Sequence, residues 1–137
     1  MGDASRLRFL LDTHIWIWSL LEPEHLTRKV RKALESEGSE LWLSPISVWE
    51  MLILVEKRRL TLNIETDEWL KQVMQNVPIR EAPITIEIAR LSRTVSLAHQ
   101  DPADRFLAAT AMHLDLTLIT ADPRLMDSHD FSVLPNK

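Results

Sequence analysis

The sequence contains no cysteine, no long apolar run and no excess of basic residues, and each absence excludes a class of protein. Without cysteine the chain cannot form disulfides or thiolate metal sites, which fits a cytoplasmic protein. No stretch approaches the roughly 20 apolar residues that a membrane-spanning helix requires, so no membrane association is expected. The N-terminus also lacks the basic and then apolar segments of a signal peptide.

The balance of charge is acidic, with 16 Lys and Arg against 20 Asp and Glu, a net charge of −4 and a pI near 5.7. This excludes a protein that holds nucleic acid through bulk positive charge. It does not exclude a nuclease, because a carboxylate-rich site itself lowers the net charge and metal ions offset it. Any affinity for nucleic acid must then come from a local basic patch or from a partner.

The length of 137 residues and the hydrophobic content of 45% are those of one globular domain with a core of its own. No repeat, linker or segment of low complexity divides the chain. We therefore expect a single domain over residues 1–137, with residues 1–5 disordered.

Short apolar runs that read as strands alternate with longer segments that read as helices. Strands are expected at 8–11, 41–43, 79–82, 116–120 and 131–134, and helices at 14–21, 27–36, 46–58, 66–76, 84–95 and from 101 onward. The last-but-one helix is inferred from apolar residues that step by four, three and four: Ile84, Ile88, Leu91 and Val95. This alternation predicts an α/β fold with three α/β/α layers and a short parallel sheet of four to five strands.

Four acidic residues stand where such a fold gathers side chains. Asp12 and Asp122 follow strand ends, and Glu50 and Asp104 lie in the first turns of helices that begin at the same edge. In parallel sheets, ligands bind beyond the carboxyl ends of the strands. Gathered carboxylates repel one another unless a cation neutralises them, and hard oxygen ligands suit Mg²⁺ and Mn²⁺. The pattern predicts a divalent-metal site suited to phosphodiester hydrolysis.

Each acid also has a plainer interpretation. Asp12 could cap the helix that follows, with Thr13 as the alternative cap. Glu50 could form a salt bridge with an arginine inside its apolar helix. Asp101 and Asp104 both suit a helix start, and one of them is expected to do only that. Asp122 could initiate a turn before Pro123.

The histidines show no metal-ligand spacing and are interpreted as structural or surface residues. His14 and His99 are the least certain of them, since both flank the predicted site. The five are His14, His25, His99, His113 and His129.

Four segments, in this order, closely resemble motifs of the PIN-domain family, and within it the chain is similar to VapC-type toxins of toxin–antitoxin pairs. They are Leu10-Leu11-Asp12-Thr13-His14-Ile15-Trp16, Ser44-Pro45-Ile46-Ser47-Val48-Trp49-Glu50, His99-Gln100-Asp101-Pro102-Ala103-Asp104-Arg105-Phe106-Leu107-Ala108-Ala109-Thr110-Ala111 and Leu118-Ile119-Thr120-Ala121-Asp122. The likeness spans most of the chain, and the order of the four motifs makes it specific.

The resemblance implies a magnesium- or manganese-dependent endoribonuclease that hydrolyses RNA phosphodiester bonds and is held inactive by an antitoxin. The four acids of the family fall on Asp12, Glu50, Asp104 and Asp122 of this sequence. They are the residues expected to bind the metal and to carry catalysis.

Four further residues are predicted to support these acids. Thr120 matches a position that often helps the site, and Asp101 adds an acid beside the third position. Which of Asp101 and Asp104 leads the metal shell therefore stays open. Thr13 and Arg105 directly follow Asp12 and Asp104.

Two protein partners are expected. Family members are usually dimers, and the helix after Pro45 is apolar on nearly every side except at Glu50, so a homodimer is predicted. Trp16, Trp18 and Trp49 lie near the apolar helices and are candidates for a groove that accepts an amphipathic antitoxin helix. Such a partner is also expected to send a basic side chain toward the acids.

Two other classes of function compete with the ribonuclease. One is a non-catalytic module of the same fold that binds protein or RNA, and the presence of all four acids argues against it. The other is a phosphotransfer enzyme with an aspartate nucleophile. That reading is disfavoured because no second aspartate follows Asp12 by two positions.

Overall fold

A computed structural model describes residues 7–137, and the expected disorder of residues 1–5 falls outside this range. Five parallel strands form one sheet in the order β3-β2-β1-β4-β5. Their bounds are β1 (Arg8–Leu11), β2 (Glu40–Leu43), β3 (Arg80–Glu81), β4 (Thr117–Thr120) and β5 (Val133–Pro135). The predicted parallel α/β fold is thus confirmed, with β1 at the centre.

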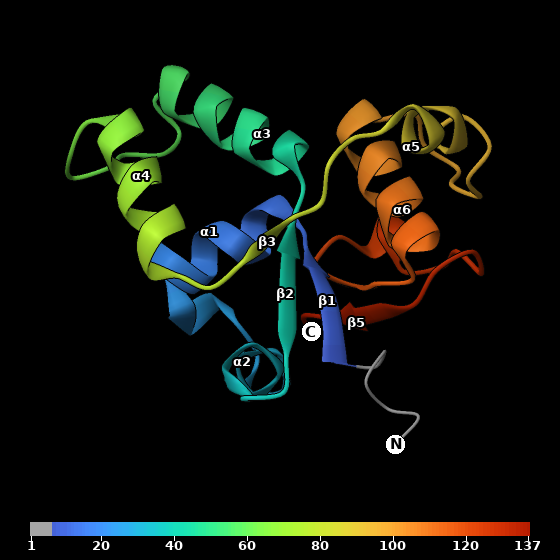
Figure 1. Ribbon diagram of the computed structural model, residues 1–137, viewed down its shortest axis with the longest axis horizontal. Coiled ribbons are helices and arrows are strands. Elements are labelled where there is room, and N and C mark those ends of the chain that lie inside the picture. Colours follow the sequence, from blue (N-terminus) through green and yellow to red (C-terminus); the bar gives the residue numbers. More distant parts are fainter. Residues whose placement is uncertain (1–6) are drawn as a thin grey trace.

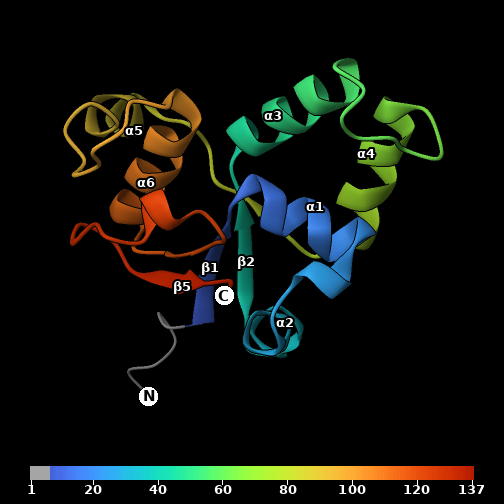
Figure 2. The same cartoon turned by 180° about the vertical axis from the view of Figure 1, so that it is seen from behind.

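Helices cover both faces of the sheet, which makes the three predicted layers (Figures 1 and 2). The two views agree that α1, α2 and α4 lie on one side of β1 and β2, and that α5 and α6 lie on the other. The helices are α1 (Thr13–Leu21), α2 (Arg28–Glu35), α3 (Pro45–Glu56), α4 (Thr66–Asn76), α5 (Ile86–Leu91) and α6 (Pro102–Leu114), with 3-10 turns η2 (Pro23–His25) and η3 (Pro123–Leu125).

A capping side chain followed by proline starts three of these elements. Ser44, Asp101 and Asp122 each accept a hydrogen bond from the first-turn backbone of α3, α6 and η3, and each is followed by Pro. Proline suits this place because it has no N–H to leave unpaired and its fixed φ is already helical. The same local signal therefore starts three elements next to predicted site acids.

Alternation along the strands divides the core between the two faces of the sheet. Phe9 and Leu11 pack with Trp16 and Ile119 on the face covered by α1. Leu10 points the other way and packs with Leu107 of α6. Because successive side chains on a strand face opposite ways, one short apolar run serves both layers.

Helix α5 is shorter than its apolar periodicity predicts. It spans Ile86–Leu91 instead of 84–95, so Ile84 precedes the helix and is exposed while Val95 is buried beyond its end. After α5, the buried guanidinium of Arg105 donates hydrogen bonds to the backbone carbonyls of Ser92, Val95 and Leu97. These carbonyls therefore have hydrogen-bond partners without a further turn of helix. No helix within residues 7–137 has the length and apolar character to cross a membrane.

Candidate active site

The four predicted acids line one cavity of about 410 Å³, although they come from four separate segments. We call this the carboxylate cavity. Its other lining residues are His14, Trp18, Asp101, Ala121 and Arg124. Asp12 and Asp122 directly follow β1 and β4, which are neighbours in the sheet, and Glu50 and Asp104 lie near the starts of α3 and α6. The cavity therefore lies where the parallel strands end.

Asp12 is buried and held by two donors. Its carboxylate accepts hydrogen bonds from the backbone N–H of Thr13 at 2.7 Å and from the hydroxyl of Thr120 at 2.6 Å. Burial raises the pKa of Asp12, and these two hydrogen bonds oppose that rise. Asp12 also caps α1, as its plainer interpretation predicts. One oxygen of this carboxylate caps the helix and the other accepts from Thr120, at the cavity that the other three acids also line.

Glu50 has a hydroxyl partner instead of the arginine that its plainer interpretation required. The Thr13 hydroxyl donates to the Glu50 carboxylate and lies 3.0 Å from the Ser47 hydroxyl. Within residues 7–137, no Lys or Arg nitrogen lies within 4 Å of the Glu50 carboxylate. Burial raises the pKa of Glu50, and the Thr13 hydrogen bond opposes the rise. Glu50 is thus an acid without a countercharge in the described chain.

Asp104 is the buried member of the acid pair that opens α6. Asp101 is exposed and caps the helix by accepting from the Asp104 backbone N–H at 3.1 Å, while Asp104 is 8% exposed. Burial raises the pKa of Asp104, and a hydrogen bond from His99 Nε2, at 2.9 Å, opposes the rise. Asp101 thus has the plainer role expected of one of them, although it too lines the cavity.

Asp122 differs from the other three acids because an arginine neutralises it. The Arg124 guanidinium lies 2.9 Å from one Asp122 oxygen and holds the pKa of that carboxyl below its usual range. The Asp122 backbone N–H donates to the Thr120 hydroxyl at 3.0 Å. Thr120 therefore contacts both Asp12 and the turn that carries Asp122.

Arg105, the other predicted supporting residue, bonds the backbone of the segment between α5 and α6. Its buried guanidinium donates to the backbone carbonyls of Ser92, Val95, Leu97 and His99 at 2.7–3.1 Å. It does not line the carboxylate cavity. It holds in place the segment that carries His99, the partner of Asp104.

Two residues of the site escape sequence reasoning. The sequence predicts a structural or surface role for His99 and marks it as one of the two least certain histidines, because it flanks the site. In the structure its ring bonds Asp104. Arg124 was not singled out at all, because a lone arginine after a proline has no pattern. Trp16 corrects the expected partner groove: it is 1% exposed and packs edge-on against Trp69, so it belongs to the core.

The donor chemistry of the cavity fits a divalent cation. Carboxylate and hydroxyl oxygens are the ligands that Mg²⁺ and Mn²⁺ prefer. Burial raises the pKa of three of the four acids, Asp12, Glu50 and Asp104, and a nearby cation would favour their charged forms. Within residues 7–137, the one set of three ligand atoms all within 4.8 Å of one another is on Glu22, Glu24 and His25. That exposed set contains an ordinary pair, Glu22–His25 at 2.7 Å. No three of the four site acids meet this spacing.

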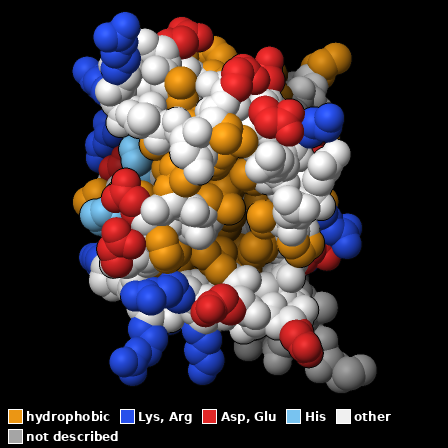
Figure 3. All heavy atoms as spheres, turned by 90° about the vertical axis from the view of Figure 1, so that its left-hand side faces the viewer, with side chains coloured by type: hydrophobic (Ala, Val, Ile, Leu, Met, Phe, Trp, Pro, Cys, Tyr) orange, Lys and Arg blue, Asp and Glu red, His pale blue; other side chains and the backbone are white. Residues whose placement is uncertain are grey.

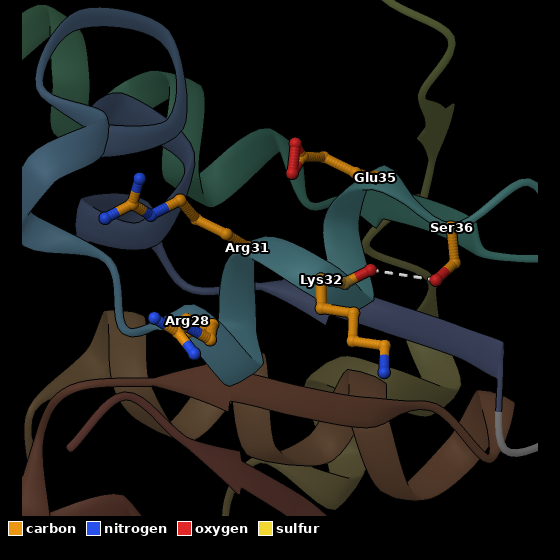
Figure 4. A pocket seen from close by; sticks show the side chains of 5 residues that line it. All are labelled: Arg28, Arg31, Lys32, Glu35 and Ser36. Atoms are coloured by element: carbon orange, nitrogen blue, oxygen red, sulfur yellow. Dashed lines mark hydrogen bonds between the residues drawn. The ribbon is translucent and has the colours of Figure 1, made fainter.

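The largest cavity among those we describe lies elsewhere. It measures about 620 Å³, and Figure 4 shows its lining side chains extending from helix α2. They are Arg28, Arg31, Lys32, Glu35 and Ser36. None of the four site acids takes part, and Figure 1 places α2 at the end of the sheet where β2 begins. This surface is a basic patch, with three basic side chains and one acid.

Comparison with known proteins agrees with the fold and with the motifs. The family model described as the PIN domain matches residues 9–131, and the chain therefore belongs to the PIN-domain family. Within that family it is 35% identical to "Ribonuclease VapC22" of Mycobacterium tuberculosis over 117 residues, which cover 85% of this chain and 88% of the relative.

Two solved structures share the fold over nearly their full length. VapBC2 from Rickettsia felis, solved with a DNA fragment from its promoter, matches with a TM-score of 0.71 and 13% identity, over 95% of this chain and 99% of that one. FitAcB from Neisseria gonorrhoeae matches with a TM-score of 0.65 and 26% identity, over 93% and 97%.

Proposed function

We propose that this protein is a magnesium- or manganese-dependent endoribonuclease and the toxin of a type II toxin–antitoxin pair. The observation that carries the proposal is the convergence of Asp12, Glu50, Asp104 and Asp122 on one cavity, in a chain 35% identical to a VapC ribonuclease. Four carboxylates in one cavity repel one another unless a cation neutralises them. The substrate is RNA, and the bond cleaved is a phosphodiester.

In this proposal the four acids hold the metal and the threonines orient them. Asp12 and Asp104 are the most buried of the four, and Thr120 and His99 fix their carboxylates. Thr13 fixes Glu50 in the same way. A bound divalent ion would supply countercharge and a water activated for attack on phosphorus. No cysteine is available as a nucleophile.

The affinity for RNA must come from a local patch, because the chain as a whole is acidic. Helix α2 offers one, since Arg28, Lys29, Arg31 and Lys32 are exposed within a single turn and a half. None of these four side chains has a salt-bridge partner among residues 7–137. We assign to this patch a sequence-independent contact with RNA phosphates away from the cleaved bond.

An apolar surface supports the proposed protein partners. Figure 3 shows hydrophobic side chains gathered across the middle of the face that carries α1 and α4, with charged groups around them. Trp49 of α3 is 54% exposed and Met74 of α4 is 43% exposed. Exposed apolar area of this kind marks interaction surfaces. We assign the exposed Trp49 on α3 to a homodimer contact, and the apolar face over α1 and α4 to an amphipathic helix of the antitoxin. The cytoplasmic location stays a prediction.

Cleavage of RNA with and without metal tests the proposal. Purified protein is incubated with a panel of structured RNAs in Mg²⁺, in Mn²⁺ and in excess EDTA, with the Asp12→Asn variant as control for contaminating nuclease. We expect cleavage by the wild type in either metal, and none in EDTA or by the variant. Cleavage undiminished in EDTA would exclude the metal mechanism. RNA binding without cleavage in any metal would favour the alternative, a non-catalytic binding module.

A further inference from the structure

Arg124 stands in the carboxylate cavity as a single cation among acids. Among the described residues that line this cavity, it is the only lysine or arginine. Its Nη2 lies 2.9 Å from an Asp122 oxygen and 3.5 Å from the Asp104 oxygen that His99 also contacts. One guanidinium thus bridges two of the four acids that the proposed metal requires.

The Arg124 side chain is largely exposed to solvent. It is 57% exposed, and its pairing with Asp122 is between neighbours in sequence. Water still solvates the guanidinium, although the two acids are only 24% and 11% exposed. An ion pair with one partner in water gains little, because the long side chain loses freedom when it is fixed. A cation of higher charge that binds Asp104 and Asp122 would therefore displace the guanidinium at small cost.

Arg124 also lines a second cavity. It measures about 550 Å³ and is lined by Arg124 together with Ser96, Leu97, Ala98, His99, Asp127 and Ser128. Arg124 and His99 are the basic groups of this lining, and the second cavity contains one acid where the carboxylate cavity contains five. A displaced guanidinium can therefore turn toward a space where a phosphate meets much less negative charge.

We propose that Arg124 positions the scissile region of RNA by binding a phosphate, and that it rests on Asp104 and Asp122 until the metal takes those carboxylates. The inference deepens the proposed function and rests on it. Arginine suits the task because its planar fork of N–H donors matches phosphate oxygens in pairs. A metal that binds Asp104 and Asp122 would release Arg124 from these acids and leave its guanidinium available to a neighbouring phosphate.

Two measurements with opposite expected signs test this exchange. In the Arg124→Gln variant, binding of Mn²⁺ alone, followed by calorimetry without RNA, is expected to tighten about two- to fivefold because an exposed competing ion pair is lost. RNA cleavage at saturating Mn²⁺ is expected to fall about 10- to 100-fold, mainly through KM. Arg124→Lys should restore part of the RNA affinity, since it keeps the charge but not the fork.

Arg90→Gln is the matched control. Arg90 is 61% exposed and pairs with Glu87 on α5 much as Arg124 pairs with Asp122, but it does not line either cavity. It should change neither measurement. If Arg124→Gln leaves Mn²⁺ binding unchanged or weakens it, the exchange is wrong. If it leaves cleavage unchanged, the phosphate role is wrong.

Failure of this inference can be told apart from failure of the proposed function. If the wild type cleaves no RNA, the ribonuclease proposal fails, and with it the phosphate role of Arg124. The Mn²⁺ comparison needs no RNA and still decides whether Arg124 competes for the acids.

Discussion

The hydroxyl of Thr120 donates to the carboxylate of Asp12 across 2.6 Å, although 108 positions separate them in the chain. The two meet because β1 and β4 are paired in parallel, with Leu11 opposite Ile119, so the residue after each pair lies at the same edge. The same hydroxyl accepts from the Asp122 backbone N–H at 3.0 Å. Thr120 therefore ties two of the proposed metal ligands together.

Replacing Thr120 by valine should separate this role from packing. The shape is kept, but buried Asp12 loses a donor, so we expect a loss of about 1–3 kcal/mol in the free energy of unfolding. Cleavage should fall about 10- to 100-fold, as for other residues that orient metal ligands. Thr110→Val is the control: Thr110 is equally buried but bonds only the Phe106 carbonyl within α6. Equal activity in both variants would contradict the orienting role.

The variants Asp12→Asn and Asp104→Asn should each abolish cleavage without unfolding the protein. Both carboxylates are proposed metal ligands, and an amide is a poorer ligand that carries no charge. Removing one charge from a set of mutually repelling acids should not lower the melting temperature in EDTA. RNA cleavage and thermal melting measure the two effects. Full activity would show that the residue is not needed for catalysis, and a large fall in melting temperature would show that its role is structural.

Asp12 should make its own contribution to the pH dependence of stability in the metal-free protein, with a direction given by its raised pKa. Its folded pKa is raised above the ordinary value of 3.8 by burial, so the folded state holds this proton more tightly than the unfolded state. Stability from this group is therefore lost as the pH rises from 3.8 through the raised value. In EDTA, Asp12→Asn should gain on the wild type as the pH rises toward neutral. A difference independent of pH would contradict this assignment.

Removing charge from helix α2 should weaken RNA binding and spare the chemistry. For Arg28→Gln with Lys32→Gln, we expect KM to rise about three- to tenfold and the dependence of binding on salt to become shallower. The value of kcat should not change, because none of these residues lines the carboxylate cavity. Lys57→Gln with Arg59→Gln removes the same exposed charge after α3. An equal effect of both pairs would assign RNA affinity to total charge and not to α2.

Trp49→Glu should convert the proposed dimer into a monomer. Trp49 is 54% exposed on α3, and a charge placed in a buried contact is costly. Light scattering at micromolar concentration measures the mass. Ile86→Glu is the control, because Ile86 is 91% exposed at the start of α5 and lies on no helix of the proposed contact. A monomeric wild type would refute the homodimer.

Local chemistry let the sequence alone predict most of the elements. Apolar runs, capping side chains and prolines act within a few residues, so strands, helix starts and the parallel α/β class could be inferred without coordinates. The places of Asp12, Glu50, Asp104 and Asp122 at strand ends and first turns could be inferred for the same reason. The end of α5 could not, because Arg105 reaches it from another helix.

The partners of each acid were decided only by the tertiary structure. Whether Asp101 or Asp104 is buried, that Thr120 bonds Asp12, and that Glu50 pairs with a threonine depend on contacts between segments distant in sequence. The same holds for Trp16, which packing draws into the core. Periodicity shows which side of a helix or strand faces inward, but not which residue of another segment contacts it. The sequence determined which acids form the site and at which end of the strands they lie. The tertiary structure determined which hydrogen-bond donors and charged groups contact each acid.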